Sequence, residues 1–212
     1  MLQLYAIPVS LYCAKTRILL RHKGLAWAEI PPPGGYGSDE YKTVVPSGNL
    51  PALRDGDLLI GDSEAIAEYL DEQFPEPAAL PADPADRALC RERSRFHDTR
   101  LEPALRALFP YLPGRAEGPA GILEQGAADI SARLAQLADL LNAAPAAGEV
   151  LTLAECGYPI TFAWMDGMCA RMDMEIAWPD TVRIYRGRLQ SLPSVAAELA
   201  DYVPKLTAFL DG

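Results

Sequence analysis

Histidine and cysteine are scarce in this chain, and the few present are scattered. It contains two histidines, His22 and His97, and four cysteines, which are Cys13, Cys90, Cys156 and Cys169. The cysteines form no C-x-x-C pair, and no group has the spacing of zinc ligands. Scattered thiols in a chain of this size are typical of a reduced, cytoplasmic protein and not of a disulfide framework. The sequence therefore gives no support for a metal site and predicts a cytoplasmic location.

Long apolar runs and an excess of positive charge are also missing. No stretch approaches the ~20 apolar residues that a membrane-spanning helix needs. The formal net charge is -10, whereas nucleic acid and anionic membranes attract proteins with a basic face. We therefore expect neither as a partner. Apolar residues, in contrast, make up 50% of the 212 positions, enough to bury a core of one large domain or two small ones.

Residues 1–76 alternate between strand and helix patterns. Strands are predicted at 2–6, 26–30, 52–54 and 58–60, and helices at 10–23 and 63–73. Asp55-Gly56 is a hairpin turn signal between the last two strands, and the proline and glycine run from Pro31 to Gly35 predicts an irregular loop. This β-α-β then β-β-α order resembles a thioredoxin-like α/β domain.

The rest of the chain has helical periodicity. Residues 77–85 have the composition of a linker, because Pro75, Pro77, Pro81 and Pro84 lie in or beside them among small residues. Beyond it, apolar residues recur every three or four positions and predict helices at 86–109, 122–141, 180–189 and 194–210. Thr152 and Glu155 form a capping box before a further helix that carries Ile160 and Trp164. We therefore expect an all-helical domain over residues 86–212.

Two short segments of the first domain predict a binding site. The first, Gly48-Asn49-Leu50-Pro51-Ala52-Leu53, contains an X-Pro bond, for which the cis form costs little. A cis Leu50–Pro51 bond would turn the backbone groups of Leu50 outward, free to pair with an extended peptide. The second segment, Asp62-Ser63, begins a helix with N–H groups and a hydroxyl for a carboxylate, and an acid for an ammonium. Together they predict a receptor for one end of a small zwitterionic peptide.

These segments resemble two elements of the cytosolic glutathione transferase superfamily, G-x-V-P-x-L and E/D-S-x-A-I. A third, Ser10 through Arg17, is similar to the S-P-x-x-x-K/R-V-R opening of the first helix in serine-type (theta, phi or zeta-like) members. The resemblance implies a thioredoxin-like glutathione-binding domain, an all-helical second domain and a homodimer. It further implies glutathione as co-substrate and a small, apolar electrophile as the second substrate. The zeta-type S-S-C opening is not reproduced by Ser10-Leu11-Tyr12.

In serine-type relatives the residue that matches Ser10 donates a hydrogen bond to the thiolate of glutathione. A free thiol has a pKa near ~8.5, and lowering it by ~2 units requires about 2.7 kcal/mol of preferential stabilisation of the thiolate. A hydroxyl at a helix N-terminus favours the anion through both its hydrogen bond and the helix dipole. Ser10 could instead simply cap its helix, and the two roles are compatible.

Two neighbours of Ser10 offer alternatives. Cysteine-type relatives (omega, beta) form mixed disulfides, but in the register set by Lys15 and Arg17 their cysteine matches Ser10 and not Cys13. Cys13 is therefore expected to be buried and inert, with a redox role as the alternative. Tyr12 is a second possible donor to the thiolate.

The sequence departs from the family pattern near the glycyl end of glutathione. The family often has a lysine where this chain has Asn49, and Val45 stands where an asparagine is expected in the preceding turn. Lys42 is a candidate to supply the missing charge. For the second substrate, the candidate lining residues are Phe109, Tyr111, Leu112 and Trp164.

Three functional hypotheses follow from these residues. The first is a glutathione transferase that activates the thiol through Ser10. The second is a non-catalytic binding protein that resembles glutathione transferases, favoured by Asn49 and Val45. The third is a thiol-disulfide reductase that acts through Cys13.

Overall fold

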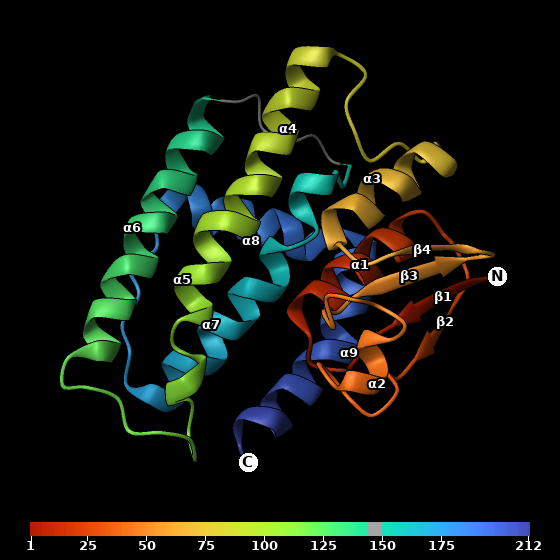
Figure 1. Cartoon of the computed structure of the whole chain (residues 1–212). Coiled ribbons are helices and arrows are strands. Elements are labelled where there is room, and N and C mark those ends of the chain that lie inside the picture. The colour runs from red at the N-terminus through yellow and green to blue at the C-terminus, as the bar shows by residue number, and fades with distance from the viewer. Residues whose placement is uncertain (144–149) are drawn as a thin grey trace.

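The computed structural model describes residues 1–143 and 150–212, and its N-terminal part is a mixed sheet with helices (Figure 1). The elements there are β1 (Leu2–Tyr5), α1 (Leu11–His22), β2 (Trp27–Ile30), α2 (Asp39–Lys42), β3 (Ala52–Asp55), β4 (Leu58–Ile60) and α3 (Ser63–Gln73). The strands lie in the order β2-β1-β3-β4. Strand β1 is parallel to β2 and antiparallel to β3, and β4 is antiparallel to β3. The predicted thioredoxin-like order is confirmed.

Helix α1 lies between the sheet and the helices of the second part (Figure 1). Its residues are therefore buried nearly all round, including the charged Lys15 and Arg17. The helix ends at His22, and two residues later Gly24 has a φ of 62°, the left-handed conformation that commonly follows a helix C-terminus. Because α1 contacts both parts of the molecule, its N-terminus is fixed relative to both.

Helix α2 was not predicted. It follows the Pro31–Gly35 segment, where the sequence indicated an irregular loop. The Ser38 hydroxyl oxygen caps it by accepting a hydrogen bond of 3.0 Å from the Tyr41 N–H. Ser38 followed by Asp39 and Glu40 is nonetheless a local signal for a helix start, and the fully buried Tyr41 side chain stabilises the helix further.

The second part consists of helices, as expected. They are α4 (Pro84–Phe96), α5 (Glu102–Arg106), α6 (Ile122–Ala143), α7 (Tyr158–Met172), α8 (Asp180–Ser191) and α9 (Pro193–Leu210). Thr152 N–H donates to the Glu155 carboxylate over 2.9 Å, so the predicted capping box forms, around a short 3-10 turn just before α7. No helix in the described ranges is long and apolar enough to cross a membrane.

The single helix predicted over residues 86–109 is wrong in detail. A π-helical turn, His97–Leu101, separates α4 from α5, and α5 ends at Arg106. Pro103 has no N–H to continue a regular α-helical ladder, and a wider turn accommodates its ring. The π turn places Asp98 beside the N-terminal domain, where it reaches Lys15.

Candidate functional site

A cavity of about 670 Å³ lies where the N-terminal domain meets the helices. Five residues singled out from the sequence line it on the N-terminal side: Ser10, Tyr12, Leu50, Asp62 and Ser63. They come from the start of α1, the segment before β3 and the start of α3. Three segments that are far apart in the chain therefore meet around one hollow.

Ser10 is the N-cap of α1. Its hydroxyl oxygen accepts a hydrogen bond of 3.3 Å from the Cys13 N–H, as a capping serine does. A hydroxyl has one donor in addition to its acceptor lone pairs. Burial raises the pKa of the Cys13 thiol, and a hydrogen bond with the Ser10 side chain lowers it in part, so the hydroxyl can turn either to that thiol or to a ligand in the cavity that it lines. Capping and donation to an anion are thus compatible in this geometry.

Asp62 is the N-cap of α3. One carboxylate oxygen, Oδ1, accepts hydrogen bonds of 2.9 Å from the N–H groups of both Glu64 and Ala65. The side chain remains exposed at the cavity, so its second oxygen can face a cation. The cap uses two of the free N–H groups of the helix end. The Ser63 hydroxyl and N–H are left for a ligand carboxylate.

The Leu50–Pro51 peptide bond is cis, as predicted. Leu50 lines the cavity, whereas Pro51 is buried and does not. The segment is held from behind, because the buried Tyr41 hydroxyl donates a 3.0 Å hydrogen bond to the Asn49 carbonyl. Leu50 therefore lies at the cavity on a fixed segment.

The two alternatives to Ser10 are already engaged. The Tyr12 hydroxyl donates to the Glu102 carboxylate over 3.0 Å. Burial, together with the negative charges of Glu102 and Asp98, raises the pKa of Tyr12 far above its usual value, so the phenol stays protonated. The Cys13 thiol is fully buried outside the cavity lining, and burial raises its pKa too. Neither thiolate chemistry at Cys13 nor donation by Tyr12 fits this arrangement well.

Lys42 does not line the cavity. Its ammonium lies 3.0 Å from the Asp39 carboxylate, in the same short helix. The structure thus does not bring this candidate together with Leu50 and Asp62.

An aromatic wall closes the helical side of the cavity. The rings of Phe109 and Trp164 are stacked with centroids 4.6 Å apart, and Phe209 meets Trp164 edge to face at 5.9 Å. All three line the cavity, as the sequence predicted for Phe109 and Trp164. Tyr111 and Leu112, the other two candidates, lie outside its lining.

Three arginines that were not predicted also line the helical side. Arg106 lies over the Phe109 ring at 5.1 Å and Arg115 over the Phe209 ring at 5.7 Å. Arg95, on α4, lies 3.6 Å from Asp98. Charged residues at 95, 98, 102 and 106 recur every three or four positions, and this helical stripe was the available signal. Arg115 and Phe209 had no comparable signal.

The sequence comparison identifies the N-terminal domain. Residues 4–78 match the family described as Glutathione S-transferase, N-terminal domain. This segment is thus similar to the N-terminal domain of glutathione S-transferases. Glutathione S-transferase Z2 of Arabidopsis thaliana is 38% identical over 115 residues, 52% of each chain. A Stringent starvation protein A homolog of Coxiella burnetii is 35% identical over 104 residues, 46% of this chain and 50% of that one. The chain thus spans about half the length of these curated relatives.

The glutathione transferase fold extends over the helical part as well. A solved structure described as Maleyl Pyruvate Isomerase, a bacterial glutathione-s-transferase in Zeta class, superposes with a TM-score of 0.76. The two are 25% identical, and the match covers 92% of this chain and 95% of the other. The chain thus resembles a zeta-class structure, although its Ser10-Leu11-Tyr12 segment differs from the S-S-C motif of that class. In the part of the chain that the structure describes, no cluster of His, Cys, Asp or Glu could hold a metal ion.

Proposed function

We propose that this chain is a glutathione transferase that activates the thiol of glutathione through Ser10. The observation that carries the proposal is the meeting of Ser10, Leu50 and Asp62-Ser63 in one cavity. Its volume of about 670 Å³ lies in the range of small-molecule sites, roughly 300–1,000 Å³. One wall offers peptide-binding and anion-stabilising groups, and the other offers aromatic rings. Such a site suits a peptide thiol facing a second substrate.

In the proposed mechanism, the γ-glutamyl ammonium binds Asp62 and its carboxylate binds the hydroxyl and N–H of Ser63. The backbone of Leu50 pairs with the peptide part of glutathione. The thiol then lies at the N-terminus of α1, where the Ser10 hydroxyl donates to the sulfur and stabilises its anion. The Cys13 N–H, by donating to the Ser10 oxygen, orients the hydroxyl for this role.

The second substrate, in our proposal, has a planar apolar body and an anionic group. The stacked rings of Phe109 and Trp164 provide a flat apolar surface. Arg106 and Arg115 lie beside that surface, and a guanidinium pairs well with a carboxylate. This refines the expectation of a purely apolar electrophile.

A matched pair of electrophiles tests this assignment, namely 4-chloro-3-nitrobenzoate and 4-chloro-3-nitrobenzamide. They share a ring and a leaving group and differ in charge. The amide is intrinsically the more reactive, because it withdraws electrons more strongly, so each kcat/KM is divided by the rate constant of the uncatalysed reaction with glutathione. We expect retention of the chain on immobilised glutathione, conjugation of both compounds, and a higher kcat/KM on this scale for the benzoate. Arg115→Gln should remove that preference and leave turnover of the benzamide unchanged. If the wild-type protein shows the same kcat/KM on this scale for both compounds, the proposal of an anionic substrate is wrong. If the protein does not bind glutathione, the proposal of a transferase is wrong.

A non-catalytic binding protein is the second candidate. It is favoured by the Stringent starvation protein A homologs among the relatives and by Asn49, where a lysine is common. Glutathione binding without conjugation of any electrophile would support it. The reductase hypothesis has no such support, because the Cys13 thiol is buried outside the cavity lining.

We further propose that the protein acts in the cytoplasm as a homodimer, on the strength of the resemblance to cytosolic glutathione transferases. Light scattering coupled to size-exclusion chromatography measures the mass directly. A mass near 46 kDa would be about twice the 23.0 kDa chain and would support the dimer.

A further inference from the structure

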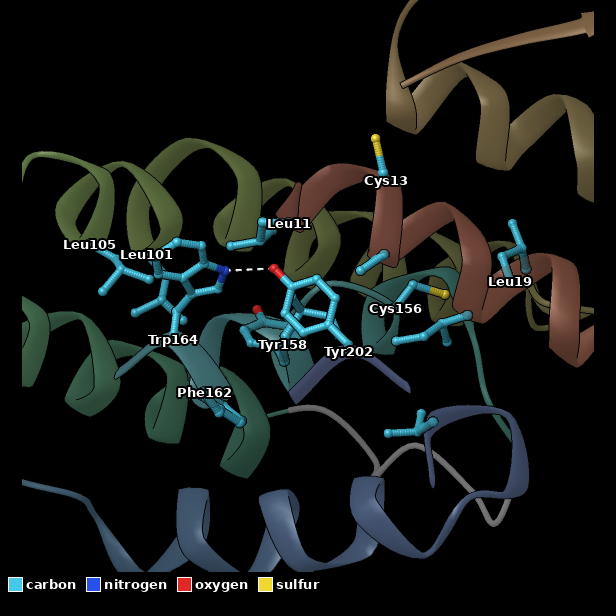
Figure 2. Packing of buried hydrophobic residues seen from close by; sticks show 14 of the residues in the cluster. Leu11, Cys13, Leu19, Leu101, Leu105, Cys156, Tyr158, Phe162, Trp164 and Tyr202 are labelled. Atoms are coloured by element: carbon cyan, nitrogen blue, oxygen red, sulfur yellow. Dashed lines mark hydrogen bonds between the residues drawn. The ribbon is translucent and has the colours of Figure 1, made fainter. Parts of the chain in front are cut away.

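A chain of contacts connects the aromatic wall to the backbone of Ser10. The Trp164 indole N–H donates a hydrogen bond of 2.7 Å to the Tyr202 hydroxyl oxygen (Figure 2). The Tyr202 hydroxyl in turn donates a hydrogen bond of 2.8 Å to the Val9 carbonyl. That carbonyl belongs to the peptide unit whose nitrogen is the Ser10 N–H. Tyr202 therefore lies between the proposed surface for the electrophile and the residue proposed to activate the thiol.

The direction of both hydrogen bonds is fixed by chemistry. An indole N–H can only donate and a carbonyl can only accept, so the hydroxyl must accept from Trp164 and donate to Val9. Burial raises the pKa of Tyr202 above its usual value, which keeps the hydroxyl protonated and able to donate. Both Tyr202 and Trp164 are buried, with exposed fractions of 0% and 2%. Hydrogen bonds in such surroundings hold their geometry firmly.

Tyr202 is itself held rigidly against α1. One turn earlier on α9, the fully buried Glu198 binds Arg17 at 2.6 Å and Arg21 at 2.9 Å. Arg17 also donates to the Pro8 carbonyl over 3.1 Å. The carbonyls of Pro8 and Val9, immediately before Ser10, are thus both fixed by side chains anchored through α9. The remaining backbone bond of this turn, from Ser10 N–H to the Ile7 carbonyl, is longer at 3.3 Å.

We propose that Tyr202 is a positioning residue, which orients the Ser10 hydroxyl toward the thiol of glutathione and couples that orientation to the Trp164 wall. The inference rests on the proposed function. Glutathione affinity should depend little on Tyr202, because Leu50, Asp62 and Ser63 lie on other segments. Stabilisation of the thiolate should depend on it strongly.

The test compares Tyr202→Phe with a matched control, Tyr158→Phe. The Tyr158 hydroxyl is also buried and also donates to a backbone carbonyl, that of Arg93, over 2.7 Å. Tyr202→Phe should leave the Kd for glutathione within twofold, lower kcat at neutral pH about tenfold and raise the pKa of the bound thiol by about one unit. Tyr158→Phe should change neither kcat nor the thiol pKa. Both variants should have a lower Tm than wild type, because each loses a buried hydrogen bond.

A double variant shows whether Tyr202 acts through Ser10. If it does, Ser10→Ala combined with Tyr202→Phe turns over no more slowly than Ser10→Ala alone, because the hydroxyl to be oriented is gone. The proposal would be overturned if the decrease in kcat of the double variant equalled the product of the two single decreases. It would also be overturned if the thiol pKa in Tyr202→Phe equalled that of wild type.

Hydrogen exchange provides a readout that needs no glutathione. Amides of the peptide spanning residues 7–14 should exchange faster in Tyr202→Phe than in Tyr158→Phe. Equal exchange would show that Tyr202 does not hold this turn. A wild-type protein that fails to bind or ionise glutathione would instead remove the proposed function, and this exchange measurement would still decide whether Tyr202 fixes the Ser10 backbone.

Discussion

Lys15 and Asp98 form a buried ion pair in which Nζ and Oδ2 are 2.7 Å apart. The same ammonium lies 2.7 Å from the carboxylate of Glu64, the residue after Ser63 on α3. The pair is supported further by His97, whose Nδ1 is 2.7 Å from the other Asp98 oxygen. Lys15 therefore ties α1, which begins at the proposed thiol site, to the start of α3 and to the helical domain.

Replacing Lys15 by methionine should destabilise the fold by about 3 kcal/mol or more, because two carboxylates with little exposure lose their cation. Denaturant unfolding measures this free energy. The control is Lys205→Met, which breaks an exposed pair with Asp201 on α9 and should cost less than about 1 kcal/mol. Similar losses in both variants would contradict a special role for the buried pair.

Ser10→Ala should cut turnover at neutral pH roughly thirtyfold, the effect of losing a charge-assisted hydrogen bond of about 2 kcal/mol. Glutathione affinity should stay nearly intact, because the contacts that hold the peptide are elsewhere. The defect should shrink as pH rises, when hydroxide ionises the thiol without help. An ultraviolet titration of the bound thiolate that overlays the wild-type curve would leave Ser10 as a helix cap only.

Asp62→Asn combined with Ser63→Ala should weaken glutathione binding at least about tenfold without unfolding the protein. Asparagine can accept the two capping hydrogen bonds of Asp62 but cannot pair with an ammonium. Calorimetry gives the affinity. Asp83→Asn is the matched control, since Asp83 caps α4 with the same geometry, Oδ1 accepting from Ala85 and Asp86 at 2.8 and 3.1 Å. Unchanged affinity in the double variant would place glutathione elsewhere.

We expect the protein to lose stability in acid as the Asp98 carboxylate becomes protonated. Burial alone would raise its pKa, but the His97 hydrogen bond and the Lys15 charge outweigh burial and hold the pKa at about 2. This pKa is below the usual 3.8, so the ionised Asp98 carboxylate stabilises the folded state by on the order of 2 kcal/mol above pH ~4. This stabilisation is lost as the pH falls toward ~2.

To check this dependence, the free energy of unfolding is measured for wild type and Asp98→Asn between about pH 2 and about pH 5. This range spans the lowered pKa, about 2, and the ordinary pKa, about 4. The gap between the two should be largest at the upper end and close as pH falls. A gap that stays constant over the range would show that the Asp98 carboxyl does not titrate with a lowered pKa. Asp211→Asn is the control, because the Asp211 carboxylate is largely exposed and should show little gap at any pH.

The N-terminal domain was predictable because its signals are local. Apolar alternation, the Asp55-Gly56 turn, the cis X-Pro segment and the Asp-Ser helix start each depend on a few neighbouring residues. The same locality explains how Leu50, Asp62 and Ser63 were predicted as site residues, whereas Ser10 was predicted from the resemblance to serine-type glutathione transferases. Helix α2 was missed because the neighbouring prolines and glycines indicated a loop, although Ser38 followed by Asp39 and Glu40 is a local signal for a helix start.

The helical half of the site was less predictable. Phe109 and Trp164 were found as aromatics, but Arg115 and Phe209 come from segments whose approach to the cavity only the tertiary fold determines. The break at His97–Leu101 was also hidden, since a regular helix over 86–109 satisfies the apolar spacing equally well. Tyr202 lies nearly two hundred residues from Val9, at a separation of 193, and no pattern in the sequence connects them.

The ion pairs of α1 have a consequence for chimaeras of this protein. Lys15 and Arg17 lie in the N-terminal domain, while their buried partners Asp98 and Glu198 lie in the helical part. A recombinant hybrid that joins residues 1–76 to the helical part of another transferase would leave Lys15 with Glu64 alone and Arg17 with the partly exposed Glu29 alone, unless the recipient offers acids at the same places as Asp98 and Glu198. A working hybrid therefore requires acids equivalent to Asp98 and Glu198 in the helical part that receives this domain.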